Sequence, residues 1–153
     1  KEVRIQLTEK TGVNYDRPIK FSDIQEGDFV GSAAAPGPDG KWVAREVHLF
    51  PASRRGSSGD SIPWDDTGAT MTNATLSRIA KISDGHELTL RYQGGEKIIN
   101  VPENAPVVTN ERGDTSLLVP GSLVFAFVDT GSDGALTARF IQATSKDGVK
   151  PAL

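Results

Sequence analysis

The chain has 153 residues, 37% of them hydrophobic and 24% charged, which suits one ordinary globular domain or two small ones. Its 16 Gly, nine Pro and single Met predict many short elements joined by tight turns rather than long helices. A net charge of −3 disfavours nucleic acid as a partner, the lack of cysteine excludes disulfides and thiolate chemistry, and the lack of a long apolar run excludes a membrane span.

Residues 1 to about 48 correspond to a later part of the chain at a constant offset. Glu26-Gly27-Asp28-Phe29-Val30 is matched by Pro120-Gly121-Ser122-Leu123-Val124, 94 residues later, and the alignment needs no gap. The same offset aligns further apolar and turn residues: Ile5 with Ile99, Leu7 with Val101, Val13 with Val107, Asp39-Gly40 with Asp133-Gly134, and Val47 with Ile141. We therefore predict two copies of one module, the first of which begins at its third strand.

The segment that joins the two copies, residues 51–71, lacks periodicity and concentrates unusual side chains together with the preceding His48. The candidate binding residues are His48, Arg54, Arg55, Trp64, Asp65 and Met71. A simpler interpretation is that Phe50, Pro51, Pro63 and Trp64 only pack this segment against the barrels. Likewise Arg45, Arg54 and Arg55 either pair with the nearby aspartates or bind an anionic partner.

The second copy contains five predicted strands. Residues 74–82 form the first, with an apolar spacing that slips once and predicts a bulge. Leu88, Leu90 and Tyr92 alternate with polar residues, and a turn at 93–96 leads into a third strand with Ile99 and Val101. After the irregular segment 102–119, residues 123–128 and 136–143 form the last two strands around the turn Ser132-Asp133-Gly134. The expected core is Leu76, Leu88, Leu90, Ile99, Val101, Val107, Leu123, Phe125 and Phe127.

The predicted fold is all-β, with two tandem five-stranded OB-like barrels; an SH3-like barrel is the second choice. The predicted domains are the C-terminal part of a first barrel at 1–50, the joining segment at 51–71 and a complete second barrel at 72–153. A barrel that lacks its first hairpin exposes strand edges. We therefore expect an upstream hairpin, self-association or a protein partner at the open barrel edge.

Several motifs resemble exported bacterial proteins of unknown function that carry tandem OB-like β-barrel modules. The resemblance covers almost the whole chain and is carried by Gly27-Asp28-Phe29-Val30-Gly31, Glu46-Val47-His48-Leu49-Phe50-Pro51, Arg55-Gly56, Pro63-Trp64-Asp65 and Met71-Thr72-Asn73-Ala74-Thr75. It implies a signal peptide, an upstream hairpin and a periplasmic or secreted location, but no activity. The chain departs from the pattern at Arg54, where Met is expected, and at Ser61, where His is expected.

The sequence favours a non-catalytic exported binding or structural module that uses no cofactor. No spacing of Ser or Thr with His48 or His86 indicates a nucleophile with its base. The alternative is a periplasmic metal-handling protein of the copper type at the barrel junction, where His48 and Met71 would bind Cu(I) beneath Trp64 or Trp42. Asp60, Asp65 and Asp66 form a comparable candidate site for a hard cation.

Overall fold

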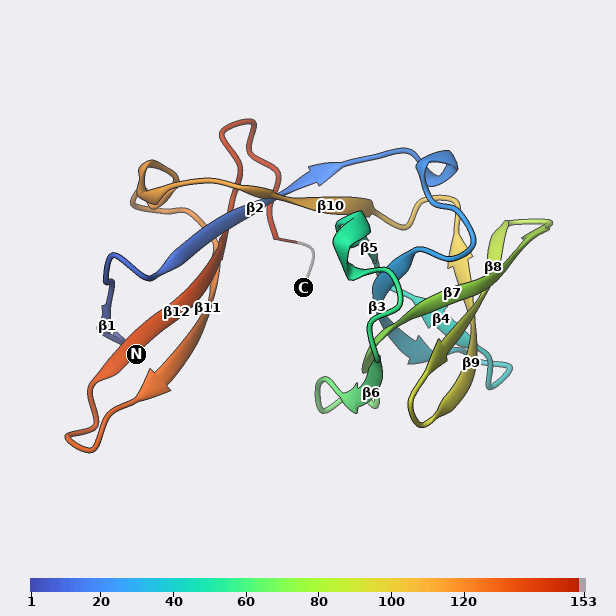
Figure 1. The fold of residues 1–153 in the computed structure, drawn as a ribbon, viewed down its shortest axis with the longest axis horizontal. Coiled ribbons are helices and arrows are strands. Elements are labelled where there is room, and N and C mark those ends of the chain that lie inside the picture. Colours follow the sequence, from blue (N-terminus) through green and yellow to red (C-terminus); the bar gives the residue numbers. More distant parts are fainter. Residues whose placement is uncertain (152–153) are drawn as a thin grey trace. The chain divides into compact units, whose positions relative to one another are not determined.

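The computed structural model describes residues 1–151 and consists of strands and short 3-10 turns (Figure 1). Its described residues contain no α-helix, which confirms the all-β class. The last two residues of the predicted second barrel, 152–153, lie outside the described residues.

The chain forms two compact units. The barrel unit is Pro18–Thr109, and the open unit combines Lys1–Arg17 with the chain from Asn110 onward. The units therefore divide the chain differently from the predicted ranges 1–50, 51–71 and 72–153, because each unit contains strands from both predicted copies. The chain passes from one unit to the other within β2 and within β10.

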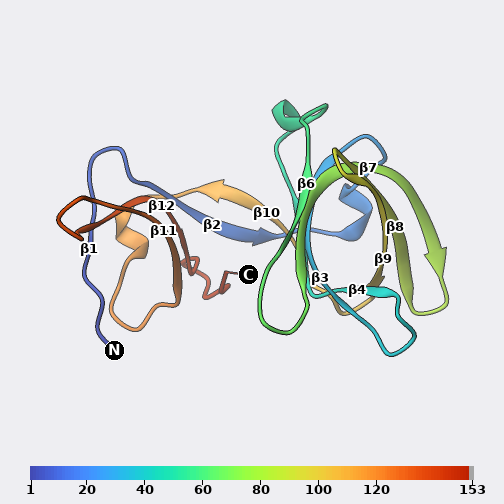
Figure 2. The same ribbon diagram turned by 90° about the horizontal axis from the view of Figure 1, so that it is seen from below.

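Five curved strands close the barrel unit into a ring, visible in Figure 2. β7 pairs with β8, β8 with β9, β9 with β4, β4 with β3, and β3 returns to β7. All these pairs are antiparallel except β4 with β9, which is parallel. The strands are β3 (Phe29–Pro36), β4 (Trp42–Ala44), β7 (Thr70–Ile82), β8 (Gly85–Tyr92) and β9 (Gly95–Pro102). The predicted β-barrel is confirmed in this form, as one closed barrel.

Other elements of the barrel unit extend this ring. The short β5 pairs with β3 and, in parallel, with the first residues of β10, while β6 pairs with the start of β7. They span β5 (Val47–Leu49), β6 (Asp60–Pro63), β10 (Val107–Arg112), η1 (Phe21–Asp23) and η2 (Ala52–Arg54). The bulge predicted in the first strand of the second copy is confirmed, since the pairing of β7 with β8 shifts between Leu76 and Arg78.

The barrel core combines apolar residues from both predicted copies. Leu76, Leu88, Leu90, Ile99 and Val101 are buried as predicted and pack with residues of the first copy. The contributors from the first copy are Ile24, Val30, Ala34, Ala44 and Val47. Burial of this continuous aliphatic cluster is the main source of stability of the unit.

One part of the predicted core is wrong. Leu123 and Phe127 expose 48% and 41% of their surface, and Phe125 is only partly buried. The reason is that the hairpin 29–44, rather than 123–143, closes the barrel around Leu88 and Leu90.

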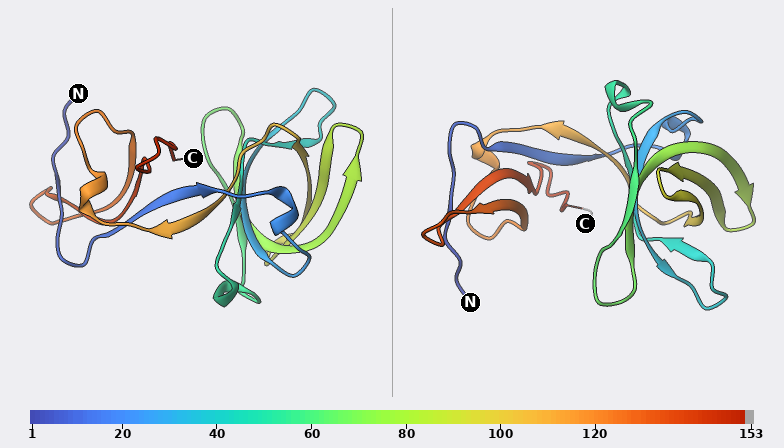
Figure 3. Two further views of the ribbon diagram at one scale, coloured as in Figure 1. Left: turned by 90° about the horizontal axis from the view of Figure 1, so that it is seen from above. Right: turned by 60° about the horizontal axis from the view of Figure 1, so that its bottom comes forward.

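The open unit is built around the long strand β12. One edge of β12 pairs with β11 antiparallel, and the other pairs in parallel with β1 and then with β2, as Figures 1 and 3 show. These elements are β1 (Ile5–Gln6), β2 (Gly12–Pro18), η3 (Thr115–Leu117), β11 (Val124–Thr130) and β12 (Leu136–Ala143). Its small core contains Val13, Leu117, Ala138, Ile141 and Ala143.

A buried polar cluster lies beside that small core. Gln142 donates to the Asp16 carboxylate over 2.6 Å, and Asn110 donates to both Gln142 and Asp16 over 3.0 and 3.2 Å. Asp16 and Gln142 are buried, so these hydrogen bonds offset the cost of removing their polar groups from water. We interpret the cluster as structural.

The two units contain corresponding strand pairs, whose residue numbers differ by 94. Where a pair joins the two predicted copies, the copy that supplies each strand in one unit supplies the opposite strand in the other unit. Ile5 pairs with Leu136 as Ile99 pairs with Trp42, and Val13 pairs with Ile141 as Val107 pairs with Val47. Within the hairpins, Val124 pairs with Ala143 as Val30 pairs with Leu49. Strands that are consecutive within one predicted copy are therefore divided between the two units.

Candidate functional site

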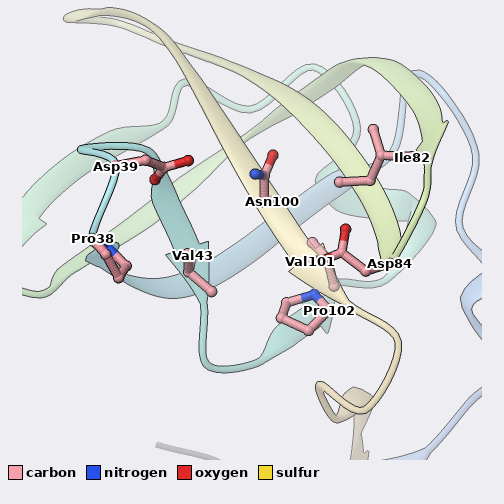
Figure 4. A pocket seen from close by; sticks show the side chains of 8 residues that line it. All are labelled: Pro38, Asp39, Val43, Ile82, Asp84, Asn100, Val101 and Pro102. Atoms are coloured by element: carbon pink, nitrogen blue, oxygen red, sulfur yellow. The ribbon is translucent and has the colours of Figure 1, made fainter.

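A pocket of about 370 Å³ opens on the barrel unit beside β9 (Figure 4). The turn 37–41 between β3 and β4 forms one wall, and the turn 83–84 between β7 and β8 forms another. The floor is the C-terminal half of β9. The lining residues are Pro38, Asp39, Val43, Ile82, Asp84, Asn100, Val101 and Pro102.

Local sequence explains the shape of the turn 37–41. Gly40 adopts a φ of +76°, which a residue with a side chain rarely takes. The Asp39 carboxylate accepts a hydrogen bond from the Lys41 amide over 3.1 Å, and the Gly37 amide donates to the Lys41 carbonyl over 2.6 Å. These contacts hold Asp39 at the rim of the pocket.

The pocket combines apolar walls with acidic groups. In the view of Figure 4, Asn100 projects from β9 between Asp39 on one side and Asp84 on the other. None of the eight lining residues is basic or aromatic. Two carboxylates, one side-chain amide and aliphatic surface are suited to a ligand group that is cationic or donates hydrogen bonds.

A second hollow of about 490 Å³ is lined by Asn100, which also lines the first pocket, and by Gly40, Lys41 and Trp42. There Lys97 Nζ lies 4.0 Å from the centre of the Trp42 ring and donates to Ser61 Oγ and Thr70 Oγ1 over 3.0 and 2.9 Å. Burial lowers the pKa of Lys97 from its ordinary value. Because Lys97 covers one face of the Trp42 ring, a ligand cannot stack on that face.

Two of the six candidate residues named from the sequence, His48 and Arg54, lie around the Phe29 and Phe50 rings, and a third, Arg55, binds next to them in the chain, at Asp28. The ring of His48 stacks beside Phe50, with 6.2 Å between centroids, and the Arg54 guanidinium lies 5.1 Å from the Phe29 ring centre. Arg55 binds the buried carboxylate of Asp28 through two nitrogens, over 2.6 and 3.0 Å. These contacts anchor the joining segment to β3 and β5.

His48 is also paired within its own strand region. Its Nδ1 lies 2.8 Å from a carboxylate oxygen of Glu46, and both side chains are buried. The other Glu46 oxygen accepts a hydrogen bond from the Ala33 amide over 3.2 Å. The pair therefore satisfies buried polar groups within the barrel unit.

Trp64, Asp65 and Met71 lie in different surroundings. Asp65 accepts hydrogen bonds from Thr67 and Arg45, and these contacts, the Thr67 hydroxyl foremost, lower its pKa to about 2. Met71 is buried in β7, where it pairs with Ala33 and Ile62. Trp64 is partly buried, and its amide donates to the Ala69 carbonyl over 2.8 Å.

Several of the proposed metal ligands make other contacts in the structure. Across residues 1–151, no group of three or more His, Asp or Glu side chains is placed to hold a metal ion. For the copper alternative, His48 Nδ1 is bonded to Glu46 and Met71 lies in the barrel wall. For the hard-cation alternative, Asp65 is bound by Arg45 and Thr67.

Sequence reasoning identified the pocket residues only as turn formers. The sequence analysis names Asp39-Gly40 as turn residues, and both lie in the turn 37–41, but it singles out neither Asp84 nor Asn100. The sequence offered no local signal for a pocket here, because its polar side chains come from three separate segments. The pocket forms only because the strands that flank the turns 37–41 and 83–84 belong to one barrel.

Comparison with protein-family models, curated proteins and solved structures found no match for this chain. Among the residues that the structure describes, no helix has the length and apolar character needed to cross a membrane. The geometry of the two units is therefore the basis for any functional inference.

Proposed function

We propose that this protein is a non-catalytic binding module whose barrel unit is OB-like and holds its ligand in the pocket beside β9. In an OB-type barrel the first strand pairs with the second and fourth, and the third pairs in parallel with the fifth. The ring matches this order if β7, β8 and β9 are the first three strands and β3 and β4 the last two. In this assignment, strands from both predicted copies form the one barrel.

A tandem duplication is part of this proposal. It is supported by the exchanged registers at the 94-residue offset and by the two 3-10 turns, which start at Phe21 and at Thr115 with the same separation. The Arg17 guanidinium bonds to Glu111, 94 residues away, over 2.7 Å, so corresponding residues of the two copies also contact each other.

The observation that carries the function is the placement of the pocket. It lies where the turns 37–41 and 83–84 meet β9, which is the ligand-binding region of OB-type barrels. Its acidic rim disfavours nucleic acid. Because its lining contains no aromatic ring, it also lacks the stacking surface typical of saccharide sites.

The ligand class that fits best is a short extended peptide with a basic side chain. Asp39 and Asp84 would bind the cationic group, the Asn100 amide would bond the peptide backbone, and Pro38, Val43 and Pro102 would contact the aliphatic part of the side chain. We also propose export to the periplasm or the medium, which is supported by the family resemblance of the motifs and is tested by cell fractionation.

The test is an amide NMR titration with lysine- and arginine-containing pentapeptides, with acidic pentapeptides and with a neutral oligosaccharide. Basic peptides should shift the amides of the two turns and of 100–102. Asp39→Asn, which keeps an oxygen for the Lys41 amide, should weaken binding about twofold to fivefold. The matched control is Asp133→Asn, because Asp133 makes the same turn contact, to the Ala135 amide, in the open unit. No shift in the turns, or an equal loss in both variants, would refute the proposal.

A further inference from the structure

The open unit has two strand edges that are covered at the corresponding positions of the barrel unit. In the barrel unit, β7 pairs antiparallel with β3 and β8 pairs antiparallel with β9. The corresponding strands of the open unit are β11 and β1, and within residues 1–151 each of them pairs only with β12. The outer edges of β11 and β1, where counterparts of β7 and β8 would pair, are therefore unpaired among the described residues.

The side chains along these edges are apolar and exposed. Val124 exposes 40% of its surface, whereas its counterpart Val30 exposes none. Ile5 exposes 37%, whereas its counterpart Ile99 exposes none. Val3, Leu7, Leu123 and Phe127, on or beside the same two strands, are exposed as well. We call these six exposed apolar residues of the open unit the open-edge surface. Surfaces of this kind mark interaction sites in soluble proteins.

We propose that the open-edge surface binds a β-hairpin from outside these 153 residues, which adds one strand to β11 and the other to β1 and so completes a second barrel. The geometry specifies both pairings as antiparallel, by equivalence with β7 on β3 and β8 on β9. This inference is independent of the pocket beside β9, which lies in the other unit.

The barrel unit also specifies the chemistry of the hairpin. Its own hairpin β7–β8 presents Ala74 and Leu76 from one strand and Leu88 and Leu90 from the other, and all four are fully buried. The incoming hairpin should therefore carry small and medium aliphatic residues at alternate positions of both strands, facing the core of the open unit, with polar residues between them.

A second copy of the chain satisfies these requirements less well. The β7–β8 hairpin of another copy is already paired on both outer edges, with β3 and with β9. Two copies could still pair through β11 alone, but that contact would leave the edge of β1 uncovered. Dimerisation is accordingly an outcome of the test that contradicts the proposal.

The experiment uses the full chain and a synthetic peptide with the sequence of residues 70–92 as the probe. Binding should shift the amides of 3–7 and 123–128 and slow their hydrogen exchange about tenfold or more. It should also reduce the fluorescence of a bound hydrophobic dye. A peptide with Leu76→Asp and Leu88→Asp should do neither. In the protein, Val124→Lys should abolish binding, whereas Ile62→Lys, at an exposed apolar residue of β6 in the barrel unit, should not.

A fusion protein keeps the proposal testable if the free peptide does not fold. The sequence of residues 70–94 is fused ahead of Lys1, which reproduces the spacing by which Gly95 follows that hairpin. The fusion should raise the melting temperature and protect the amides of β11. The proposal is overturned if the fusion leaves these amides unprotected, or if light scattering finds a dimer whose dissociation is required before the probe binds.

Discussion

Truncation of two isoleucines at corresponding positions tests the difference between the two units. Ile99 in β9 is fully buried, whereas Ile5 in β1 is 37% exposed. Ile→Ala removes three carbons, worth about 0.8 kcal/mol each when buried, and the cavity adds to this, so Ile99→Ala should cost about 2.5–5 kcal/mol. Ile5→Ala should cost at most about 1.5 kcal/mol, because part of its surface is already in water and no closed cavity forms.

Urea unfolding followed by two probes provides the assay. Trp42 and Trp64 both lie in the barrel unit, so their fluorescence reports on that unit, while far-ultraviolet circular dichroism reports on both. Ile99→Ala should lower the fluorescence midpoint by about 1 M urea or more, and Ile5→Ala should leave it nearly unchanged. If Ile5→Ala lowered the free energy of unfolding as much as Ile99→Ala, Ile5 would be enclosed and the open-edge surface would not exist.

Three further predictions concern single sites. Glu46→Ala should lower the free energy of unfolding by about 3 kcal/mol in urea titrations, because it leaves the buried His48 without its carboxylate partner; a loss below about 1 kcal/mol would show that the pair is not structural. Thr67→Val should raise the pKa of Asp65 from about 2 toward 3.8 in a carboxyl NMR titration. Since the folded pKa is the lower one, this carboxylate stabilises the fold above pH 3.8 and loses that effect as the pH falls to about 2, and an unchanged titration would contradict the assigned contact. Gly59→Ala should destabilise the barrel unit in thermal melts, because a Cβ there would collide with the backbone of β7; an unchanged melting temperature would mean that β6 is not seated on β7.

Much of the strand and turn pattern follows from local residue chemistry. The alternation of Leu88 and Leu90 sets which face of β8 is buried, since a strand turns successive side chains to opposite faces. The Asp-Gly turns at 39–40 and 133–134 form as predicted, because each Gly takes a positive φ that other residues avoid. The candidate pocket was less accessible to such reasoning, because its polar side chains come from three separate segments.

The choice between the two hairpins depended on tertiary structure. Phe29-Val30 and Leu123-Val124 have the same spacing, similar apolar character and the same following turn, so neither local propensity nor periodicity distinguishes which hairpin packs on Leu88 and Leu90. In the structure Val30 pairs with Ala74 on β7, and Val124 stays exposed. The sequence by itself thus determined most of the strands and the tight turns between them. Only the long-range pairing of β3 with β7 and β4 with β9 decided which strands share a core, because a barrel is selected by the total apolar surface it encloses rather than by any one segment.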